Sequence, residues 1–391
     1  MADSLKEKVS KEIDARRKRL IEVTMAIHGE PELGHQEFKA SALLASELKE
    51  LGFEVEKGTS GLPTAFKAVR RGEGEGPTVA IIAEYDALPE LGHACGHNII
   101  AASALGAGAG LSAVMDELDG TVIVFGTPAE EGYAENAGGK VIMLDEITKA
   151  DVAIMIHPGS RYGVGSTSLA RESFMIYFKG KAAHAGAIPE RGINALEGVL
   201  LTYQGINALR QHLMRDIRIH GVIKDGGAAP NIVPETASAH FYVRAPTVEI
   251  LEETLEKVKN CARGAALATG SEVSFRRVAN TYANKVPNMA LSEAFKVNLE
   301  ALGAEFPEAA AERPGASTDF GTVSQAMPAA TASIFIGENV ALHSYDATKV
   351  TASETAHEAV IISAKGLAHT AIDALTDADL LKRIKKEHSD R

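Results

Sequence analysis

Short apolar runs alternate with helical stretches along most of the chain. The apolar runs have the length of buried strands, and they occupy residues 79–83, 121–125, 152–156 and 332–336. Stretches of helical composition lie between them, such as residues 99–118 and 291–302. Continuous apolar strands that alternate with helices predict an α/β fold with a mostly parallel sheet that is covered by helices on both faces.

The middle of the chain has a different pattern. Alternating, strand-like segments and helical segments follow one another at residues 174–179, 194–210, 238–244, 248–267 and 272–278. This order is typical of a small α+β domain with antiparallel strands. We therefore expect a catalytic domain in two pieces, residues 1–170 and 282–391, with a smaller domain at residues 171–281 inserted between them.

The two ends of the chain are rich in charged residues. Apolar residues recur at helical spacing within residues 5–28, and a second helix near residues 38–51 is expected to stop at Gly52. The charged segment 382–391 is expected to fray or to end in solvent.

Composition narrows the class of protein and its location. The chain has 391 residues, and its net charge of -12 argues against a nucleic-acid partner, which would require a basic surface. Only two cysteines, Cys95 and Cys261, are present, so a reducing compartment is expected. The first twenty residues are rich in charge and lack an apolar core, so we do not expect a secretory leader, and no apolar run predicts a membrane-spanning helix. A cytoplasmic protein without a membrane partner is the resulting expectation.

Candidate metal ligands follow the predicted strands. Cys95 and His97 are two residues apart, so in an extended segment both point to the same side. A lone Cys-Gly-His is more often a loop with a buried thiol. However, Glu131, His157 and His343 each follow a separate predicted strand and can converge on the same point. Five sulfur, nitrogen and oxygen donors suit a pair of metal ions that share a bridging ligand.

Two acidic positions near these ligands are candidates for other roles. Glu130 and Glu131 are neighbours in a loop, so one can bind metal while the other acts on a water molecule as general base. Two solvated loop glutamates are the alternative. Asp86 follows a buried strand, where it can orient a ligand histidine or simply form a turn before Pro89.

Three further motifs do not by themselves indicate a function. His184 and Asn231, in the inserted domain, are more often structural than catalytic in such contexts. The glycine-rich run at residues 106–110 does not follow a strand, so we reject a dinucleotide site and expect close helix packing instead.

Taken together, the motifs resemble those of the co-catalytic metallopeptidase and aminoacylase family. The resemblance covers nearly the whole chain and lies in its amidohydrolase branch, which includes aminobenzoyl-glutamate, hippurate, auxin-conjugate and β-alanyl-dipeptide hydrolases. It rests on the motifs at residues 84–89, 93–98, 128–132, 183–186, 230–234 and 317–319.

The resemblance implies a hydrolase that holds two divalent metal ions per subunit, with Zn²⁺, Mn²⁺ or Co²⁺ as candidates. The implied ligands, with the first of them bridging, are Cys95, His97, Glu131, His157 and His343. Glu130 would be the general base, and Asp86 would support the metal ligands without binding metal itself. The implied reaction is cleavage of the amide bond of an N-acyl amino acid, an aminobenzoyl-glutamate-like conjugate or a dipeptide by a metal-bound water.

The resemblance also implies roles for the inserted domain. It would be a lid that forms a homodimer, and His184, assisted by Asn231, would stabilise the tetrahedral oxyanion in the active site of the neighbouring subunit. Arg244 and Arg313 would bind the carboxylate of the substrate.

The chain departs from the family pattern at two positions, and two other functions compete. Many relatives have His or Asp at Glu84, and many have Asp at Asn98. Both variants are closest to the aminobenzoyl-glutamate and β-alanyl-dipeptide hydrolases. The alternatives are a cysteine hydrolase that uses Cys95 as its nucleophile and a non-catalytic binding protein on the same scaffold.

Overall fold

The computed structural model describes residues 2–307 and 315–391, which divide into two compact units. The first unit is Met1–Thr167, Lys285–Pro314 and Asp319–Arg391, and the second is Ser168–Asn284 and Gly315–Thr318. The short segment 315–318 was assigned to the catalytic domain from the sequence. It joins the second unit because the Leu169 N–H donates to the Ala316 carbonyl (2.9 Å) and Arg244 donates to the Ser317 hydroxyl (2.9 Å).

A large sheet forms the centre of the first unit. Within the described residues it has seven strands in the order β1-β2-β4-β3-β5-β11-β6. The strands are β1 (Glu54–Lys57), β2 (Phe66–Arg71), β3 (Thr78–Glu84), β4 (Thr121–Thr127), β5 (Val152–Gly159), β6 (Gly163–Val164) and β11 (Ala329–Phe335).

The predicted α/β class is confirmed. The apolar runs of the sequence correspond to β3, β4, β5 and β11, which are adjacent and parallel. The strands β1, β2 and β6 were not predicted from the sequence. They pair antiparallel toward the edges of the sheet. They are short or partly exposed, so they contain no continuous apolar run.

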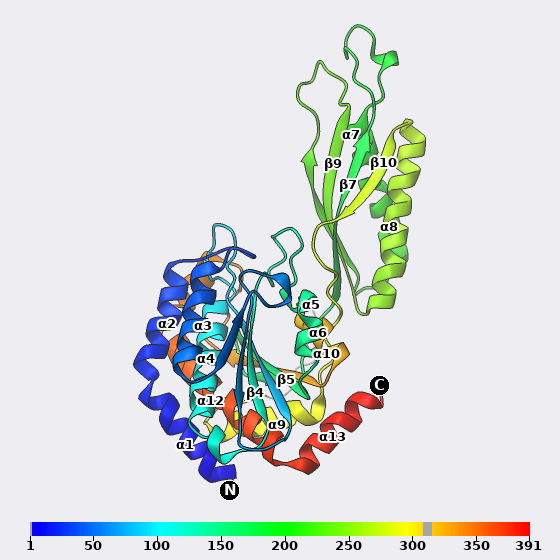
Figure 1. Ribbon diagram of the computed structural model, residues 1–391. Coiled ribbons are helices and arrows are strands. Elements are labelled where there is room, and N and C mark those ends of the chain that lie inside the picture. The colour runs from blue at the N-terminus through cyan, green and yellow to red at the C-terminus, as the bar shows by residue number, and fades with distance from the viewer. Residues whose placement is uncertain (1, 308–314) are drawn as a thin grey trace. The chain divides into compact units, whose positions relative to one another are not determined.

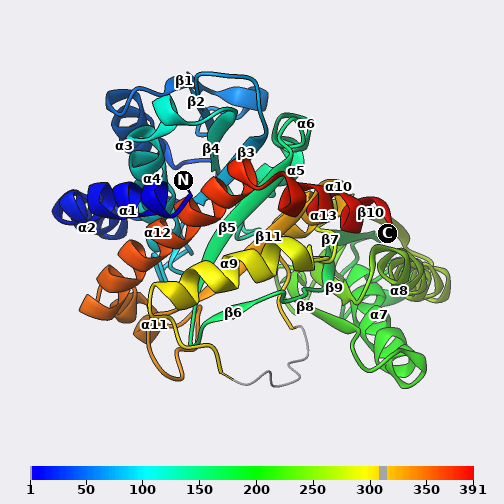
Figure 2. The ribbon, with the colours of Figure 1, turned by 90° about the horizontal axis from the view of Figure 1, so that it is seen from below.

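Helices lie on both sides of this sheet. The first unit contains α1 (Ala2–Ala15), α2 (Arg17–Gly29), α3 (Phe38–Glu50), α4 (His97–Ser112), α5 (Gly139–Ile142), α6 (Leu144–Ile147), α9 (Met289–Ala301), α10 (Phe320–Ala326), α11 (Tyr345–Val350), α12 (Glu354–Thr376) and α13 (Ala378–Ser389). Figure 2 shows α4 and α12 on one side of the sheet and α5, α6 and α10 on the other. This arrangement explains why the parallel strands are apolar on both faces.

The glycine-rich run lies inside α4 and permits close helix packing, as expected from the sequence. A Cβ atom at Gly106 would lie 2.8 Å from the Ala364 Cβ of α12, and one at Gly110 would lie 2.7 Å from Val9 of α1. Such distances are shorter than ordinary contacts, so a larger side chain would force the helices apart.

The C-terminal segment ends in solvent, as one of the two expectations stated, but most of it is a helix and is not frayed. Residues 378–389 form α13, which buries Leu380 and Ile384. The Ile384 carbonyl accepts a hydrogen bond from the Asn288 side chain (2.9 Å), and Arg391 donates to the Val286 carbonyl (3.0 Å). The charged residues form the exposed side of an amphipathic helix, whose pattern was overlooked because its apolar residues are few.

The second unit is an α+β structure. Within the described residues its sheet has four strands in the order β10-β7-β9-β8, all antiparallel. Its elements are β7 (Ala170–Lys179), α7 (Ala195–Leu209), β8 (Arg218–Asp225), β9 (Thr236–Ala245), α8 (Val248–Thr269) and β10 (Glu272–Arg277). The two helices lie along one face of this sheet (Figure 1), where the apolar residues of β7 and β9, such as Phe174 and Phe241, are buried. The unpredicted strand is β8, whose residues are mostly exposed.

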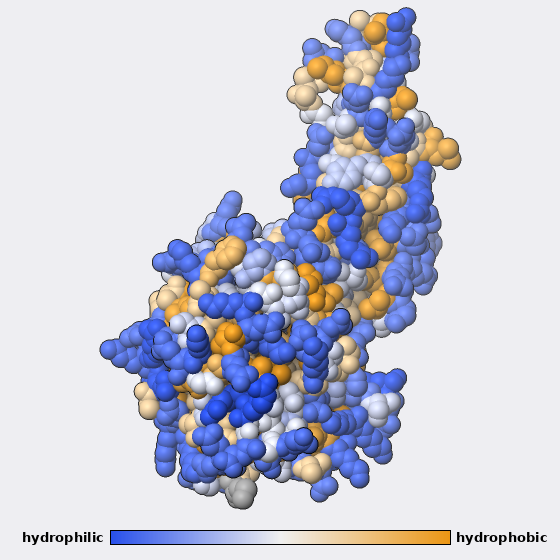
Figure 3. All heavy atoms as spheres, in the orientation of Figure 1, coloured by the Kyte–Doolittle hydropathy of each residue, from blue (hydrophilic) through white to orange (hydrophobic). Residues whose placement is uncertain are grey.

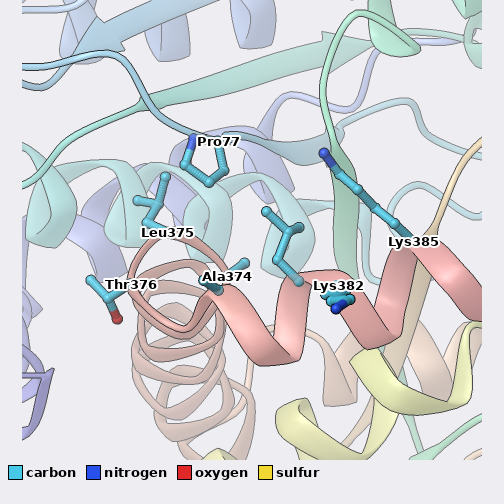
Figure 4. Close-up of a pocket in the computed structure, with 8 residues that line it drawn as sticks. Pro77, Ala374, Leu375, Thr376, Lys382 and Lys385 are labelled. Atoms are coloured by element: carbon cyan, nitrogen blue, oxygen red, sulfur yellow. The ribbon is translucent and has the colours of Figure 1, made fainter.

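The surface is mainly hydrophilic on the face that Figure 3 shows, with hydrophobic residues in small groups. None of the helices within the described residues is long and apolar enough to cross a membrane. A hollow of about 400 Å³ lies where α12 meets α13, lined by residues that include Pro77, Leu375, Lys382 and Lys385 (Figure 4). Pro77 precedes the start of β3, so this hollow is at the end of that strand opposite to the candidate site.

Candidate metal centre

The candidate residues are carried by loops at the carboxyl ends of the parallel strands. Asp86 follows the end of β3, Glu130 follows the end of β4, and His157 lies near the end of β5. The loop before α4 turns at Gly96, whose φ is +79° and whose Cβ would lie 2.7 Å from Pro158. Glycine is therefore required between Cys95 and His97, for both its backbone conformation and its small size.

Within the described part of the chain, the donor atoms form overlapping groups in which all members lie within 4.8 Å of one another. These groups are Cys95–His97–His157, Cys95–Glu131–His343 and His97–Glu130–Glu131. The Cys95 Sγ is 3.5 Å from the His157 Nε2, and the Glu131 Oε2 is 3.5 Å from the His343 Nε2. Cys95, His97 and Glu131 each belong to two of these three groups, and such sharing of donors is compatible with a pair of metal ions.

His343 reaches this cluster from the loop after β11. Its backbone has a positive φ of +64°, and its N–H donates to the Ala94 carbonyl at 3.0 Å. This hydrogen bond joins the His343 loop to the loop that carries Cys95. The strained backbone of a non-glycine residue is often found at functional sites.

Asp86 holds two of the donor segments. Its Oδ1 is 3.0 Å from the His97 Nδ1, and its Oδ2 accepts the Glu131 N–H at 3.0 Å. A proton on Nδ1 leaves the lone pair of the ring on Nε2. The His97 Nε2 is buried and has no hydrogen-bond partner among the described residues. A bound cation would satisfy this nitrogen, and a carboxylate on the opposite ring nitrogen is the usual support of a metal-bound histidine.

Burial shifts the pKa values of three candidate ligands, His157, Glu131 and Cys95. It lowers the pKa of His157 to about 4, so the imidazole is neutral at neutral pH, as a metal ligand must be. Burial raises the pKa of Glu131 to about 7 and raises that of Cys95 well above its usual value. Divalent cations would offset this cost for the carboxylate and the thiolate, so the residues present fit a metal pair.

Glu130 differs from Glu131 in its surroundings. It is buried, and its carboxylate also lies within 4.8 Å of donor atoms of Glu84 and Asp319. Burial first, and then the negative charges of Glu84, Glu131 and Asp319, raise the pKa of Glu130 well above its usual value. A carboxyl group with a raised pKa beside candidate metal ligands is suited to accept and release a proton.

A buried charge cluster borders Glu130, and its lysine was not identified from the sequence. The Lys140 ammonium is 2.6 Å from both the Glu84 and Asp319 carboxylates, and all three side chains are inaccessible to solvent. The Lys140 N–H also donates to Asp319 at 3.0 Å. A lysine that follows two glycines resembles a solvated residue in the sequence, so nothing local indicated this role.

Asn98, the other departure from the family pattern, forms hydrogen bonds that connect three helices. Its amide donates to the Thr24 hydroxyl and to the Thr351 carbonyl, both at 3.0 Å. It therefore ties the start of α4 to α2 and to the end of α11.

The remaining candidates belong to the second unit or are not described. His184 and Asn231 are neighbours, because the Ala185 N–H donates to the Asn231 carbonyl at 3.0 Å, and both side chains are exposed. The His184 Nδ1 accepts from the Gly186 and Ala187 N–H groups, both at 3.2 Å. Arg244 lies on β9 of the same unit. Arg313 lies outside the described residues.

A parallel sheet with sulfur, nitrogen and carboxylate donors beyond its strands, and a carboxyl group beside them, defines a hydrolase of the metallopeptidase type. The comparisons with known proteins agree with this class. The family model described as a peptidase dimerisation domain matches residues 172–269. The Xaa-Arg dipeptidase of Mus musculus is 37% identical over 98% of this chain and 92% of its own length.

Other relatives lead to the same family. One of the p-aminobenzoyl-glutamate hydrolase subunits of Escherichia coli is 28% identical over 96% of this chain and 93% of its own length. A dinuclear metal-binding peptidase of the M20 family from Bacillus subtilis has the same fold, with a TM-score of 0.68 and 22% identity over 93% of this chain and 99% of its own. The chain belongs to the M20 family of peptidases. The resemblance drawn from the sequence is confirmed, as is the prediction of a hydrolase of amide or peptide bonds.

The buried cluster predicts an effect on stability. Replacing Lys140 by methionine leaves Glu84 and Asp319 buried without their counter-charge, which typically costs about 3–5 kcal/mol. Urea unfolding of Lys140→Met should show this loss. Lys67→Met is the matched control, because Lys67 pairs with Glu146 at 2.9 Å where both are partly exposed, and its loss should cost only about 0–1 kcal/mol. Equal, small effects in both variants would contradict a charged Lys140 cluster.

Proposed function

We propose that the protein is a metal-dependent amidohydrolase that cleaves the amide bond of an N-acyl amino acid, an aminobenzoyl-glutamate-like conjugate or a dipeptide. The observation that carries this proposal is the convergence of the Cys95, His97, Glu131, His157 and His343 donors beside the buried Glu130. The names of the mouse and Escherichia coli relatives support this range of substrates.

Each residue of the cluster has a part in the proposed reaction. The residues Cys95, His97, Glu131, His157 and His343 would hold two divalent ions, Zn²⁺, Mn²⁺ or Co²⁺, which supply Lewis acidity when bound. Glu130 takes a proton from the attacking water and passes it to the leaving nitrogen. Asp86 keeps the proton of His97 on Nδ1 and holds the Glu131 backbone, so that both donors stay in place.

The surroundings of Cys95 argue against a cysteine hydrolase. A nucleophilic thiol must be a thiolate, yet burial and the neighbouring Glu131 raise the pKa of Cys95 well above its usual value. A non-catalytic binding protein is less favoured, because it has no need of a general base with a raised pKa next to the donors.

We propose that the second unit contributes to turnover and to assembly. The Nδ1 of His184 accepts two backbone hydrogen bonds, so its neutral form has the proton on Nε2, where it can donate to a developing oxyanion. Asn231 is the second donor, and Arg244 and Arg313 are the candidates for the substrate carboxylate. The match of residues 172–269 to a dimerisation domain supports a homodimer. A cytoplasmic location remains a prediction from the cysteine content.

Glu130→Gln tests the general base. This variant should fold and bind metal, while kcat falls about 10²–10⁴-fold because the amide cannot accept the proton. Glu135→Gln is the matched control, since Glu135 is exposed on the same loop, and it should retain full activity. Steady-state kinetics with parallel metal analysis measure both effects. Normal turnover by Glu130→Gln would remove this residue as the base.

A substrate panel tests the reaction class. Dialysis against a chelator should abolish hydrolysis, and Zn²⁺, Mn²⁺ or Co²⁺ should restore it. The panel contains acyl-glutamates, acyl-aromatic amino acids, β-alanyl dipeptides and dipeptides that end in arginine, and at least one class should be cleaved. Hydrolysis by the metal-free protein would indicate the cysteine hydrolase instead. Failure of the metal-loaded protein on every class would favour a binding protein.

His184→Ala tests the oxyanion donor. Loss of one such donor typically costs about 3–4 kcal/mol of transition-state stabilisation, so kcat should fall at least about tenfold. The metal content should be unchanged, because His184 belongs to none of the donor groups. His212→Ala, which removes another exposed histidine of the second unit, is the control. Unchanged kcat in His184→Ala would refute the assignment.

A further inference from the structure

The loop between α2 and α3 contacts the segment that carries the proposed base. Glu37, at the end of this loop, is completely buried. Its Oε1 accepts the N–H of Ala129 at 2.9 Å, and its Oε2 accepts the hydroxyl of Thr64 at 2.8 Å. A buried carboxyl group that binds a backbone N–H across 92 residues of sequence fixes the position of that backbone.

Ala129 directly precedes Glu130 and has an unusual backbone. Its φ is +57°, a left-handed conformation that costs free energy in a residue other than glycine. Surrounding contacts must therefore impose it. Gly34, in the same α2–α3 loop, lies so close that an added Cβ would be 2.9 Å from the Ala129 Cβ. The loop thus holds Ala129 by a hydrogen bond and by close packing.

The same loop makes further contacts with the site loops. The His35 Nε2 is 3.2 Å from the Asn136 carbonyl, at the far end of the loop that starts after β4. The Glu32 carbonyl accepts the Ala87 N–H at 2.8 Å, next to Asp86. The segment between α2 and α3 therefore supports both the Glu130 loop and the Asp86 loop.

We propose that Glu37 is a positioning residue for catalysis, which holds the backbone at Ala129 so that Glu130 and Glu131 are directed to different groups of the cluster. This inference rests on the proposed role of Glu130 as general base. Glu37 itself does not belong to any of the donor groups. Without its hydrogen bond, Ala129 can relax toward an ordinary backbone conformation, which would turn Glu130 away from the water that it deprotonates.

A glutamine should replace Glu37 in this role. Burial, and then the Asp86 carboxylate, raise the pKa of Glu37 to about 8, so the carboxyl group is mainly protonated at neutral pH. Glutamine has the same shape as the protonated acid. Its Oε1 can accept the Ala129 N–H, and its amide N–H can donate to the Thr64 oxygen, with donor and acceptor exchanged in that contact.

The loop also contains a matched control. The Glu32 carboxylate accepts the Lys39 N–H at 2.9 Å and the Ala40 N–H at 3.0 Å, in the first turn of α3. Like Glu37, it binds backbone N–H groups, but its side chain does not contact the Glu130 loop through any hydrogen bond among those of the described residues. Glu32→Ala therefore removes a structural interaction only.

The test compares Glu37→Ala, Glu37→Gln and Glu32→Ala as metal-loaded, full-length proteins. The substrate is p-aminobenzoyl-glutamate or a dipeptide that ends in arginine, whichever the unmodified protein cleaves faster. Glu37→Ala should lower kcat at least about tenfold with KM and metal content nearly unchanged, since a displaced catalytic group loses rate rather than binding. Glu37→Gln should restore kcat to within about threefold of the unmodified protein. Glu32→Ala should lower the thermal midpoint but not kcat.

Several outcomes would overturn the inference. One is unchanged kcat in Glu37→Ala, and another is equal impairment of Glu37→Gln and Glu37→Ala. If Glu37→Ala does not fold, Glu37→Asp replaces it, because the shorter side chain cannot reach Ala129; normal kcat in that variant would also overturn the inference. Glu130→Gln separates the two proposals: if it is inactive while Glu37→Ala is fully active, only the positioning role fails, whereas an active Glu130→Gln removes the proposed base itself.

Discussion

The site depends on one fully buried carboxylate, that of Asp86. Burying a charged group is costly unless hydrogen bonds or opposite charges compensate it. Asp86 meets this requirement by binding the His97 ring through one oxygen and the Glu131 backbone through the other. The two donor segments come from different strands, so this carboxylate fixes their separation. Cys95 precedes His97 by two residues, so it lies near the same point. The Cys95 Sγ is in turn 3.5 Å from the His157 Nε2.

The charges around this carboxylate would favour the binding of cations. The described residues place acidic side chains from several loops within a small buried volume, and these are Glu84, Asp86, Glu130, Glu131 and Asp319. Lys140 compensates two of them directly, Glu84 and Asp319. On the side of Cys95 and His343, bound cations would supply further compensating positive charge. Glu130 lies between these two regions. It is next to Glu84 and Asp319 of the Lys140 cluster and next to the candidate metal ligands His97 and Glu131.

Sequence patterns predict those parts of the structure that local chemistry specifies. The central strands are apolar on both faces and were recognised as continuous runs, whereas β1, β2 and β8 are partly exposed and lack such a signal. Donors such as His157 and Glu131 were found because they directly follow buried strands. Lys140 and Glu37 were missed, because a buried charged residue and a solvated one look the same in sequence. Their roles arise from partners 179 and 92 residues away, Asp319 and Ala129.

The candidate site residues are divided between the two units of the chain. The donor cluster and Glu130 belong entirely to the first unit, whereas His184, Asn231 and Arg244 belong to the second. The chain passes between the units near residues 168, 284, 315 and 318. The last of these passages ends at Asp319, which the buried Lys140 holds by an ion pair and a backbone hydrogen bond. The ion pair that borders the proposed base therefore also anchors the chain where it returns from the second unit. A single buried lysine thus links the electrostatics of the site to the path of the chain.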